Sequence, residues 1–229
     1  MKIYWPRRAP GLPPGQRLMT EMPRFTDRPF KPPPDMAAEP RFEITNEGAP
    51  IAILSGADLE ALGPRDHVAD FHCVTTWSVT GLVWRGVPLR DVFASVGITE
   101  PLAPYLVASS EDRRSVAFLW EDAAAADVIL ATHLDGDPLD DRRGGPLRLV
   151  APSQYGYKSG KFISAIDFRT ERPKVMGKEH LRARVAHEER HPRLPSWMVK
   201  GPYRLTIPPT GYLAERTLRR HRSSKLGRA

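Results

Sequence analysis

The sequence predicts an α+β fold: a mixed, β-rich domain with short helices. Runs of strand length alternate with short helical patterns, but they show no regular strand–helix–strand rhythm and no internal repeat. Of the 229 residues, 41% are hydrophobic, which is sufficient for one sizeable core. We therefore expect a single main domain with flanking segments.

The N-terminal segment is rich in proline, in "APGLPPGQ" and "RPFKPPPDMAAEP". Because proline fixes φ and donates no hydrogen bond, residues 1–40 are expected to form an extended arm that wraps the main domain. The Arg7–Arg8 pair is followed by Ala9–Pro10–Gly11 instead of an apolar core, which indicates no signal peptide. With one cysteine and no apolar run near about 18–20 residues, a cytoplasmic location without a membrane span is expected.

Residues 41–172 carry the predicted main domain. Ser55 and Asp58 indicate a capping box at its first helix, Gly97 stops the second helix, and Asp135–Gly136 is a strong hairpin-turn signal. In chain order we expect strands over 41–45 and 51–54, a helix over 58–62, strands over 67–74 and 78–84, a helix over 88–96, strands over 105–110 and 115–120, a helical turn over 121–127, and strands over 128–134, 146–152 and 161–170.

Residues 173–229 differ in character and are predicted to form a charged helical extension. Charged helices are expected over 177–191 and 213–222, separated by an irregular stretch punctuated by proline. The extension has too few apolar residues for its own core, so it should pack on the main domain or on a partner. The net charge of +7 favours anionic partners, and much of the excess lies in residues 216–229.

Two other functions are consistent with parts of the extension. His187–Glu188–Glu189–Arg190–His191 fits H-E-x-x-H, the pattern of a zinc-dependent hydrolase. A solvated helix is favoured instead, because its faces are charged, Pro192 ends it and a third zinc ligand is not evident. Residues 216–229 would suit a non-enzymatic nucleic-acid-binding module, but they lack the interleaved aromatic residues of a stacking surface, so no nucleic acid is expected.

The main chemical signal joins Cys73 to a stretch about 70 residues later. Cys73 is the single cysteine, and its placement in an apolar strand is typical of a small core residue. The later stretch gathers two adjacent glycines with Arg148, Ser159 and Lys161. Glycine amides can approach a phosphate closely while the cations supply charge, so an anion site is predicted there. The spacings of a Walker loop and of a dinucleotide fingerprint are absent.

Together the two stretches resemble the molybdopterin-binding domain of the sulfite oxidase family, which includes the catalytic subunit of methionine sulfoxide reductase. The resemblance covers roughly residues 41–168. One motif is Cys73 followed by W-x-G-V-P-L at 84–89, and the other is G-G-P-L-R-L-V-x-P…Y-G-Y-K-S-x-K at 144–161. Their order and separation make the signal specific. The resemblance implies the sulfite-oxidase-type molybdopterin-binding fold of a short, single-domain member.

The resemblance also implies a molybdenum–molybdopterin cofactor with Cys73 as the one protein ligand to the metal, and a soft thiolate suits such a metal. Relatives commonly carry asparagine or histidine where this chain has Arg143, so the geometry of that contact differs here. A buried, hydrogen-bonded histidine is the alternative for His72. The implied cofactor contacts are His72, Ser109 or Ser110, Arg143, Arg148, Tyr157, Lys158, Ser159 and Lys161.

The implied activity is two-electron oxygen-atom transfer on a small oxyanion or sulfoxide. Arg113 and Arg114 are the substrate-side candidates, with Arg114 as the catalytic one, where relatives more often carry a glycine–tyrosine pair. A solvated hairpin tip is the alternative for this pair. No heme domain fits in the remaining length, so a separate electron-transfer partner is expected. The sequence leaves the substrate, the direction of transfer and the oligomeric state open.

Overall fold

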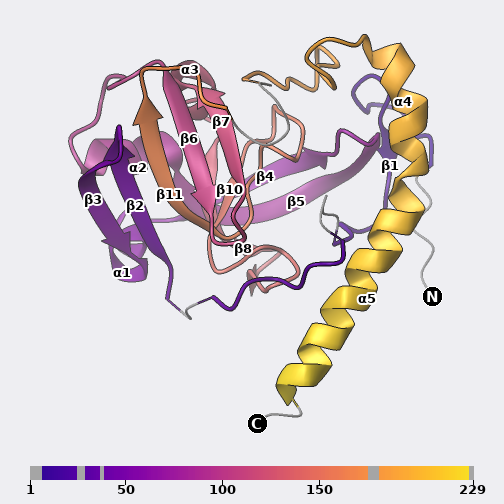
Figure 1. Cartoon of the computed structure of the whole chain (residues 1–229), viewed down its shortest axis with the longest axis horizontal. Helices are drawn as coiled ribbons and strands as arrows, with labels where there is room; N and C mark the ends of the chain where they lie inside the picture. Colours follow the sequence, from indigo (N-terminus) through magenta and orange to yellow (C-terminus); the bar gives the residue numbers. More distant parts are fainter. Residues whose placement is uncertain (1–6, 25–28, 37–38, 175–180, 227–229) are drawn as a thin grey trace.

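The computed structural model describes residues 7–24, 29–36, 39–174 and 181–226. Two β-sheets form the body, short helices cover their edges, and a long C-terminal helix runs along one side (Figure 1). The predicted α+β class is confirmed. The boundaries near residues 40 and 172 stay predictions.

One sheet has five strands in the order β3-β2-β11-β6-β7. The β2 and β11 strands pair in parallel, and the other neighbours are antiparallel. The predicted capping box is present, because the Ser55 hydroxyl accepts from the Asp58 amide at the start of α1 (Gly56–Ala61). The strands are β2 (Arg41–Asn46), β3 (Ala49–Ser55), β6 (Tyr105–Ser110), β7 (Ser115–Leu119) and β11 (Ile163–Arg169).

The second sheet follows the order β1-β5-β8-β10, with β4 added on β5 and β9 on β8. Its longest strand, β5, pairs with β4, with β8 and, in parallel, with β1 of the N-terminal segment. The strands are β1 (Arg17–Leu18), β4 (Arg65–His72), β5 (Trp77–Pro88), β8 (Ile129–Leu134), β9 (Asp137–Pro138) and β10 (Arg148–Val150).

Two apolar clusters hold the sheets. The larger lies between the five-stranded sheet, α2 (Leu89–Ser95) and α3 (Trp120–Ala123), where Phe93 packs against Trp120 and Phe168. The second surrounds Trp77 and Trp84 of β5, both nearly fully buried, and it includes Cys73. Cys73 thus lies at one end of a packed core.

The extension is where the structure differs most from the prediction. The helix expected over 177–191 is wrong in its described part, because residues 181–191 form turns. Glu188 has a φ of 52°, which a helix does not allow, and an ion pair between Arg184 and Glu189 closes the turn. The side chain of Arg190 is buried. Residues 175–180 of the expected helix lie outside the described residues.

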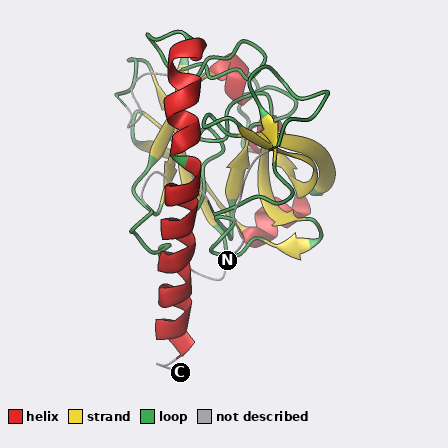
Figure 2. Ribbon diagram, turned by 90° about the vertical axis from the view of Figure 1, so that its right-hand side faces the viewer, coloured by secondary structure: helices red, strands yellow, loops and turns green. Residues whose placement is uncertain are grey.

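The stretch expected to be irregular is largely helical. It contains α4 (Ser196–Leu205) and the first turns of α5 (Ile207–Leu226), which takes in the second predicted helix. Pro208 and Pro209 stand in the first turn of α5, where backbone amides have no partner within the helix, so they are compatible with its start. The two helices form a rod along the body (Figure 2). Within the described ranges, no helix has the length and apolar character needed to cross a membrane.

Candidate cofactor site

The fold brings the two sequence motifs together. The Gly156 amide of the later motif donates to the His72 carbonyl across 2.7 Å, beside the cysteine. Cys73 lies in the tight turn that joins β4 to β5, and its amide donates to the Trp77 carbonyl at 2.8 Å. The prediction that Cys73 lies within a strand is wrong, because β4 ends at His72. A turn presents the side chain at the end of the sheet, away from the ladder.

The Cys73 thiol is buried, with a polar neighbour. Its side chain is 6% exposed, and its Sγ lies 3.1 Å from the Thr75 hydroxyl oxygen. Burial raises the pKa of Cys73, while the Thr75 hydroxyl and the positive charges of Arg190 and Lys161 oppose that rise. The thiol is therefore protonated as it stands, and metal coordination is the event that would deprotonate it.

A buried hydrogen-bond chain defines the protonation of His72. The Gln16 amide nitrogen donates to the Cys73 carbonyl at 3.2 Å, so the Gln16 oxygen faces Ser78 and accepts its hydroxyl hydrogen at 3.0 Å. Ser78 then accepts from His72 Nδ1 at 2.8 Å. Burial lowers the pKa of His72, which keeps the ring neutral. Its Nε2 is therefore a hydrogen-bond acceptor, so this nitrogen would accept a hydrogen bond from a cofactor and not donate one.

Four arginines lie close enough to Lys161 for their charges to act on it, and Lys161 in turn acts on Cys73. Burial lowers the pKa of Lys161 well below its usual range, and the nearby charges of Arg148, Arg24, Arg114 and Arg143 lower it further. Lys161 and Arg143 are half-buried, whereas Arg148 and Arg24 are buried. Such a concentration of like charge is costly unless an anion lies among it.

Arg148 is the most deeply enclosed of these cations. Its side chain stacks against Phe71 and Trp84, with the guanidinium carbon 5.1 and 5.2 Å from the ring centroids. One terminal nitrogen donates to the Arg143 carbonyl at 2.9 Å, but the buried Nε has no hydrogen-bond partner among the residues that the structure describes. Burial and the charge of Arg143 lower the pKa of Arg148 to about 9. An unpartnered buried donor beside unbalanced positive charge suits an anionic ligand.

The glycines of the later motif do not act as predicted. The amides of Gly144 and Gly145 both donate to the Asp140 carbonyl at 2.9 Å, and the Gly156 amide is bonded to His72, so these amides are not free for a phosphate. Gly144 has a φ of 91°, and a Cβ there would overlap the Lys161 side chain. Gly144 therefore admits Lys161 to the site, and the side-chain cations carry the positive charge.

Three other predicted contacts lie on the same loop but in different surroundings. Ser159 is buried, and its hydroxyl oxygen accepts from the Ala151 amide at 3.1 Å, which leaves the hydroxyl hydrogen as a donor. Burial raises the pKa of Tyr157. The Lys158 ammonium donates to the carbonyls of Ala117 and Leu181, so its hydrogen bonds do not include the five-cation group. The cofactor role of Lys158 stays a prediction.

The substrate-side candidates lie at the hairpin between β6 and β7. Arg114 is half-buried, and its Nε lies 3.2 Å from an Asp112 carboxylate oxygen. Arg113 is exposed with a φ of 62°, as expected of a hairpin tip. Ser109 pairs with Ala165 of β11 in the ladder. Of these candidates, only Arg114 is among the cations whose charge lowers the pKa of Lys161.

Sequence reasoning missed three residues at this site. Arg24, from the N-terminal segment, joins the cation group, and Gln16 bonds the Cys73 carbonyl. The Arg190 guanidinium donates to the Val74 carbonyl at 2.5 Å and lies over the Tyr155 ring. Local sequence offers little signal for any of them, because each is distant in the chain from the motifs and is brought there by tertiary packing.

The C-terminal helix α5 contacts the loop that precedes Gly144 and Gly145. Glu215 of α5 lies 2.8 Å from Arg142 and accepts from the Arg24 amide at 3.2 Å, while the Arg24 guanidinium donates to the Ala214 carbonyl at 2.7 Å. Arg222 lies 2.8 Å from Asp140 and also pairs with Asp141. The loop that precedes the two glycines is thereby held by α5.

The zinc-hydrolase alternative fails on geometry. The motif needs two histidines one helical turn apart, but residues 187–191 form turns. His191 Nδ1 accepts from the amides of Arg193 and Leu194, and Glu188 pairs with Lys200. Among the described residues, no group of three or more His, Cys, Asp or Glu side chains is placed to hold a metal ion.

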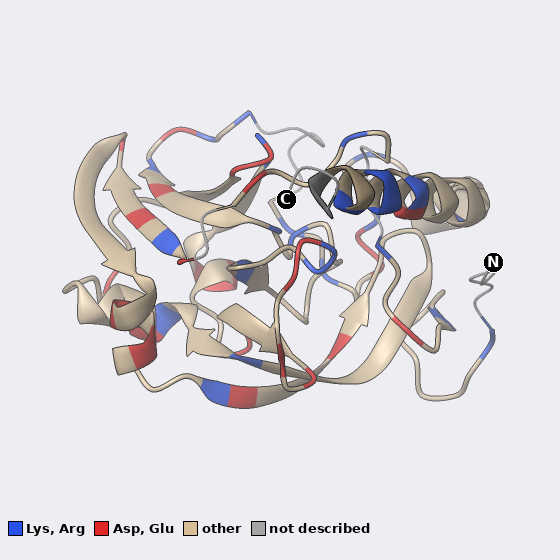
Figure 3. Cartoon of the chain, turned by 90° about the horizontal axis from the view of Figure 1, so that it is seen from below, with Lys and Arg blue, Asp and Glu red and all other residues tan. Residues whose placement is uncertain are grey.

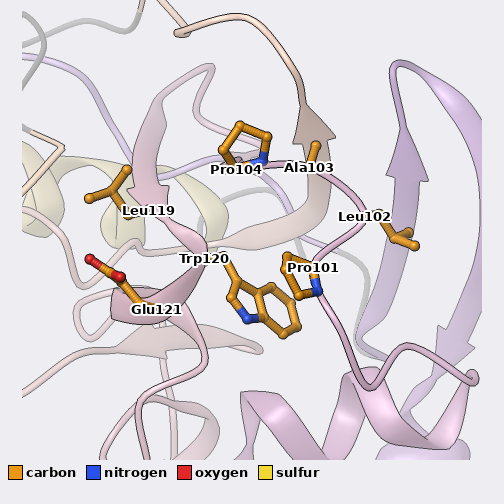
Figure 4. A pocket seen from close by; sticks show the side chains of 7 residues that line it. All are labelled: Pro101, Leu102, Ala103, Pro104, Leu119, Trp120 and Glu121. Atoms are coloured by element: carbon orange, nitrogen blue, oxygen red, sulfur yellow. The ribbon is translucent and has the colours of Figure 1, made fainter.

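A separate hollow of about 490 Å³ lies beside Trp120. It is lined by apolar residues of the segment before β6, by the last residue of β7 and by Trp120 and Glu121 of α3 (Figure 4). None of its lining residues belongs to the two motifs or to the cation group.

The site fits the molybdenum–pterin cofactor that the sequence resemblance implies. A single soft thiol lies at the end of a sheet, and a group of cations adjoins it in which the Arg148 Nε has no hydrogen-bond partner among the described residues. A pterin that carries a terminal phosphate needs both a metal ligand and a strong anion site.

Comparison with known proteins points to the same chemistry. The family model described as the oxidoreductase molybdopterin binding domain matches residues 31–176. Over 119 residues the chain is 34% identical to "Uncharacterized oxidoreductase YuiH" of Bacillus subtilis. This alignment covers 52% of the present chain and 60% of YuiH. It is 32% identical over 131 residues to the protein-methionine-sulfoxide reductase catalytic subunit MsrP of Xanthomonas campestris, covering 51% of this chain and 40% of MsrP.

The chain thus spans less than two thirds of the length of these curated relatives. Among solved structures, the sulfane dehydrogenase SoxCD from Paracoccus pantotrophus matches with a TM-score of 0.49 and 21% identity, over 58% of this chain and 38% of that chain.

Proposed function

Because this chain belongs to the oxidoreductase molybdopterin-binding domain family, we propose that it is a molybdenum-dependent oxidoreductase that transfers an oxygen atom to or from a small oxyanion or sulfoxide. The observation that carries the proposal is the hydrogen bond between Gly156 and His72, which joins the cysteine turn to the loop that bears the cations. When bound, the molybdenum pterin supplies the two-electron redox chemistry of oxygen-atom transfer.

Cys73 is the proposed metal ligand. Its buried position excludes water from the sulfur, and the Thr75 hydroxyl at 3.1 Å stabilises the thiolate by donating to it. Gln16 and Ser78 hold the His72 ring through their hydrogen bonds, so that its Nε2 lone pair has a defined orientation beside the ligand.

The cation group is the proposed binding site for the anionic end of the pterin. Arg148 contributes its unpartnered Nε, Lys161 its ammonium and Ser159 its hydroxyl hydrogen. An anion placed there would return the pKa of Lys161 toward its usual range, because it balances the four neighbouring guanidinium charges. Arg143 adds a further cation.

Arg114 is the proposed substrate contact. Its ion pair with Asp112 orients the guanidinium, and its charge adds to the positive potential of the site. A fixed cation attracts an oxyanion and polarises a sulfoxide oxygen.

The proposal assigns electron delivery to a separate partner and gives this chain no heme. The name of the Xanthomonas relative, a "catalytic subunit", describes that protein as one part of a larger enzyme. A cytoplasmic location is also part of the proposal and rests on sequence reasoning alone.

The test is elemental analysis of protein expressed with molybdate, together with pterin fluorescence after oxidation. We expect about one molybdenum per chain and turnover of a sulfoxide or an oxyanion with a reduced or oxidised viologen-type mediator. The near-isosteric Cys73→Ser variant should keep its fold and lose activity by at least about tenfold. Protein that holds zinc, or no pterin, would overturn the proposal.

A further inference from the structure

An apolar stripe lies exposed on the C-terminal rod. Leu194, Trp197, Met198, Leu205 and Tyr212 are 42, 74, 46, 77 and 48% exposed. Met198 and Leu205 are seven residues apart on α4, the spacing that keeps side chains on one side of a helix, while Tyr212 lies on α5 and Leu194 lies two residues before α4. Val199, by contrast, is buried against the body. We call these five exposed residues the α4–α5 stripe.

Positive charge lies near the α4–α5 stripe and continues along α5. The charges that act on Arg204 are those of Arg17, Arg190 and Arg8, all of the same sign, and with burial they lower its pKa. The nearby acid Glu188 is already paired with Lys200. Farther along α5, Arg216, Arg219 and Arg220 are exposed, and Figure 3 shows the basic bands along this helix. The stripe therefore suits a partner with an apolar centre and an acidic rim.

The same rod touches the cysteine turn. Arg204 of α4 donates from Nε to the Thr76 hydroxyl at 3.0 Å, and the Thr76 amide donates to the Cys73 carbonyl at 3.0 Å. Arg190, which precedes α4, donates to the Val74 carbonyl of the same turn. The helix that bears the stripe thus contacts the same β4–β5 turn that contains the proposed metal ligand, Cys73.

We infer that the α4–α5 stripe, with its rim of arginines, is the docking surface for an acidic one-electron carrier protein. The inference rests on the proposed function and names its partner. Oxygen-atom transfer moves two electrons, so each turnover needs two encounters that pass one electron each, and two protons accompany them as water is formed or consumed. Tryptophan, tyrosine and arginine are the residue types that dominate the centres of protein interfaces, and a small patch suits a transient redox encounter.

The test compares variants of the holoprotein in electron exchange with a small acidic flavodoxin. Trp197→Glu and Leu205→Glu should each lower the second-order rate constant at least tenfold, because they place negative charge within the docking surface. Val68→Glu on β4 is the matched control, because Val68 is also 74% exposed and lies outside the stripe. The rate constant of wild-type protein should fall with added salt.

Two further measurements separate the possible outcomes. A small viologen radical needs no docking surface, so its rate should be equal in wild type and in all three variants. Direct titration of flavodoxin onto the chain reports docking even if the cofactor proposal fails. Equal flavodoxin affinity in wild type and Trp197→Glu would overturn the inference. So would a stripe that instead mediates self-association, seen by sedimentation as a dimer lost in Trp197→Glu, or adsorption to anionic vesicles lost in that variant.

Discussion

The Gly156 amide and the His72 carbonyl are joined by a 2.7 Å hydrogen bond that fastens the lysine-bearing loop to the cysteine turn. Glycine is required at this point, because a Cβ on residue 156 would overlap the Phe71 ring. Phe71 in turn packs on Trp77 at 5.7 Å between ring centroids, so the close approach is set by a rigid aromatic pair.

We predict that Gly156→Ala separates the two halves of the site. The overlap should cost about 1–3 kcal/mol of stability and reduce the molybdenum content of purified protein. Thermal unfolding and elemental analysis provide the measurements. Gly211→Ala on α5 is the matched control, because no atom lies within 4 Å of a Cβ there and the position is helical, so stability should be kept or raised.

Anion binding should stabilise the chain in the absence of the pterin. Protein from a host that makes no pterin is expected to melt about 2–4 °C higher at a pyrophosphate concentration of about ten times the Kd. Lys161→Gln should remove this gain, because Lys161 lies among the cations that need a counter-charge. Arg90→Gln, an exposed position on α2, should keep it. An equal gain in both variants would contradict the assignment of the anion site.

Glu215 should hold the loop that precedes the glycine pair. Its carboxylate side chain is only 12% exposed and serves both Arg142 and the Arg24 amide, so Glu215→Gln should lower the free energy of unfolding by about 1–3 kcal/mol. The Glu215→Gln variant should also show faster amide hydrogen exchange over residues 140–145, because the loop is then held less tightly. Arg65→Gln breaks the exposed pair with Asp91 and should change stability by less than about 1 kcal/mol.

Lys158 should make stability depend on pH. Burial lowers its pKa to about 7 in the folded protein, so between about pH 7 and pH 10.5 the unfolded chain binds the extra proton. Stability therefore rises with pH across this window, and the full penalty of burying the charge applies below it. Urea titrations from pH 7 to pH 9.5 should show that Lys158→Met removes part of this rise. An unchanged slope would mean that Lys158 titrates normally in the folded state.

The strands of the main domain were predictable because their apolar alternation and turn residues are local signals. The capping box of Ser55 and Asp58, the helix before Gly97 and the hairpin at Asp135–Gly136 all occur where the sequence predicts them. The extension was not predictable in the same way. Arg190, in a run that reads as a solvated helix, is buried against Tyr155, because tertiary partners outweigh the weak preference of a charged segment.

The amino-acid sequence by itself determined the α+β class and the association of Cys73 with the Gly144–Lys161 motif, and from these the family of the chain. These features could be read from the sequence because they depend on short-range patterns and on spacing along the chain. Only the tertiary structure decided that Cys73 stands in a turn, that Arg24 and α5 complete the cation group, and that the glycine amides are already bonded within the protein. These features depend on contacts between residues far apart in the chain. Such contacts form when the sheets and the C-terminal rod pack together, and no local pattern encodes them.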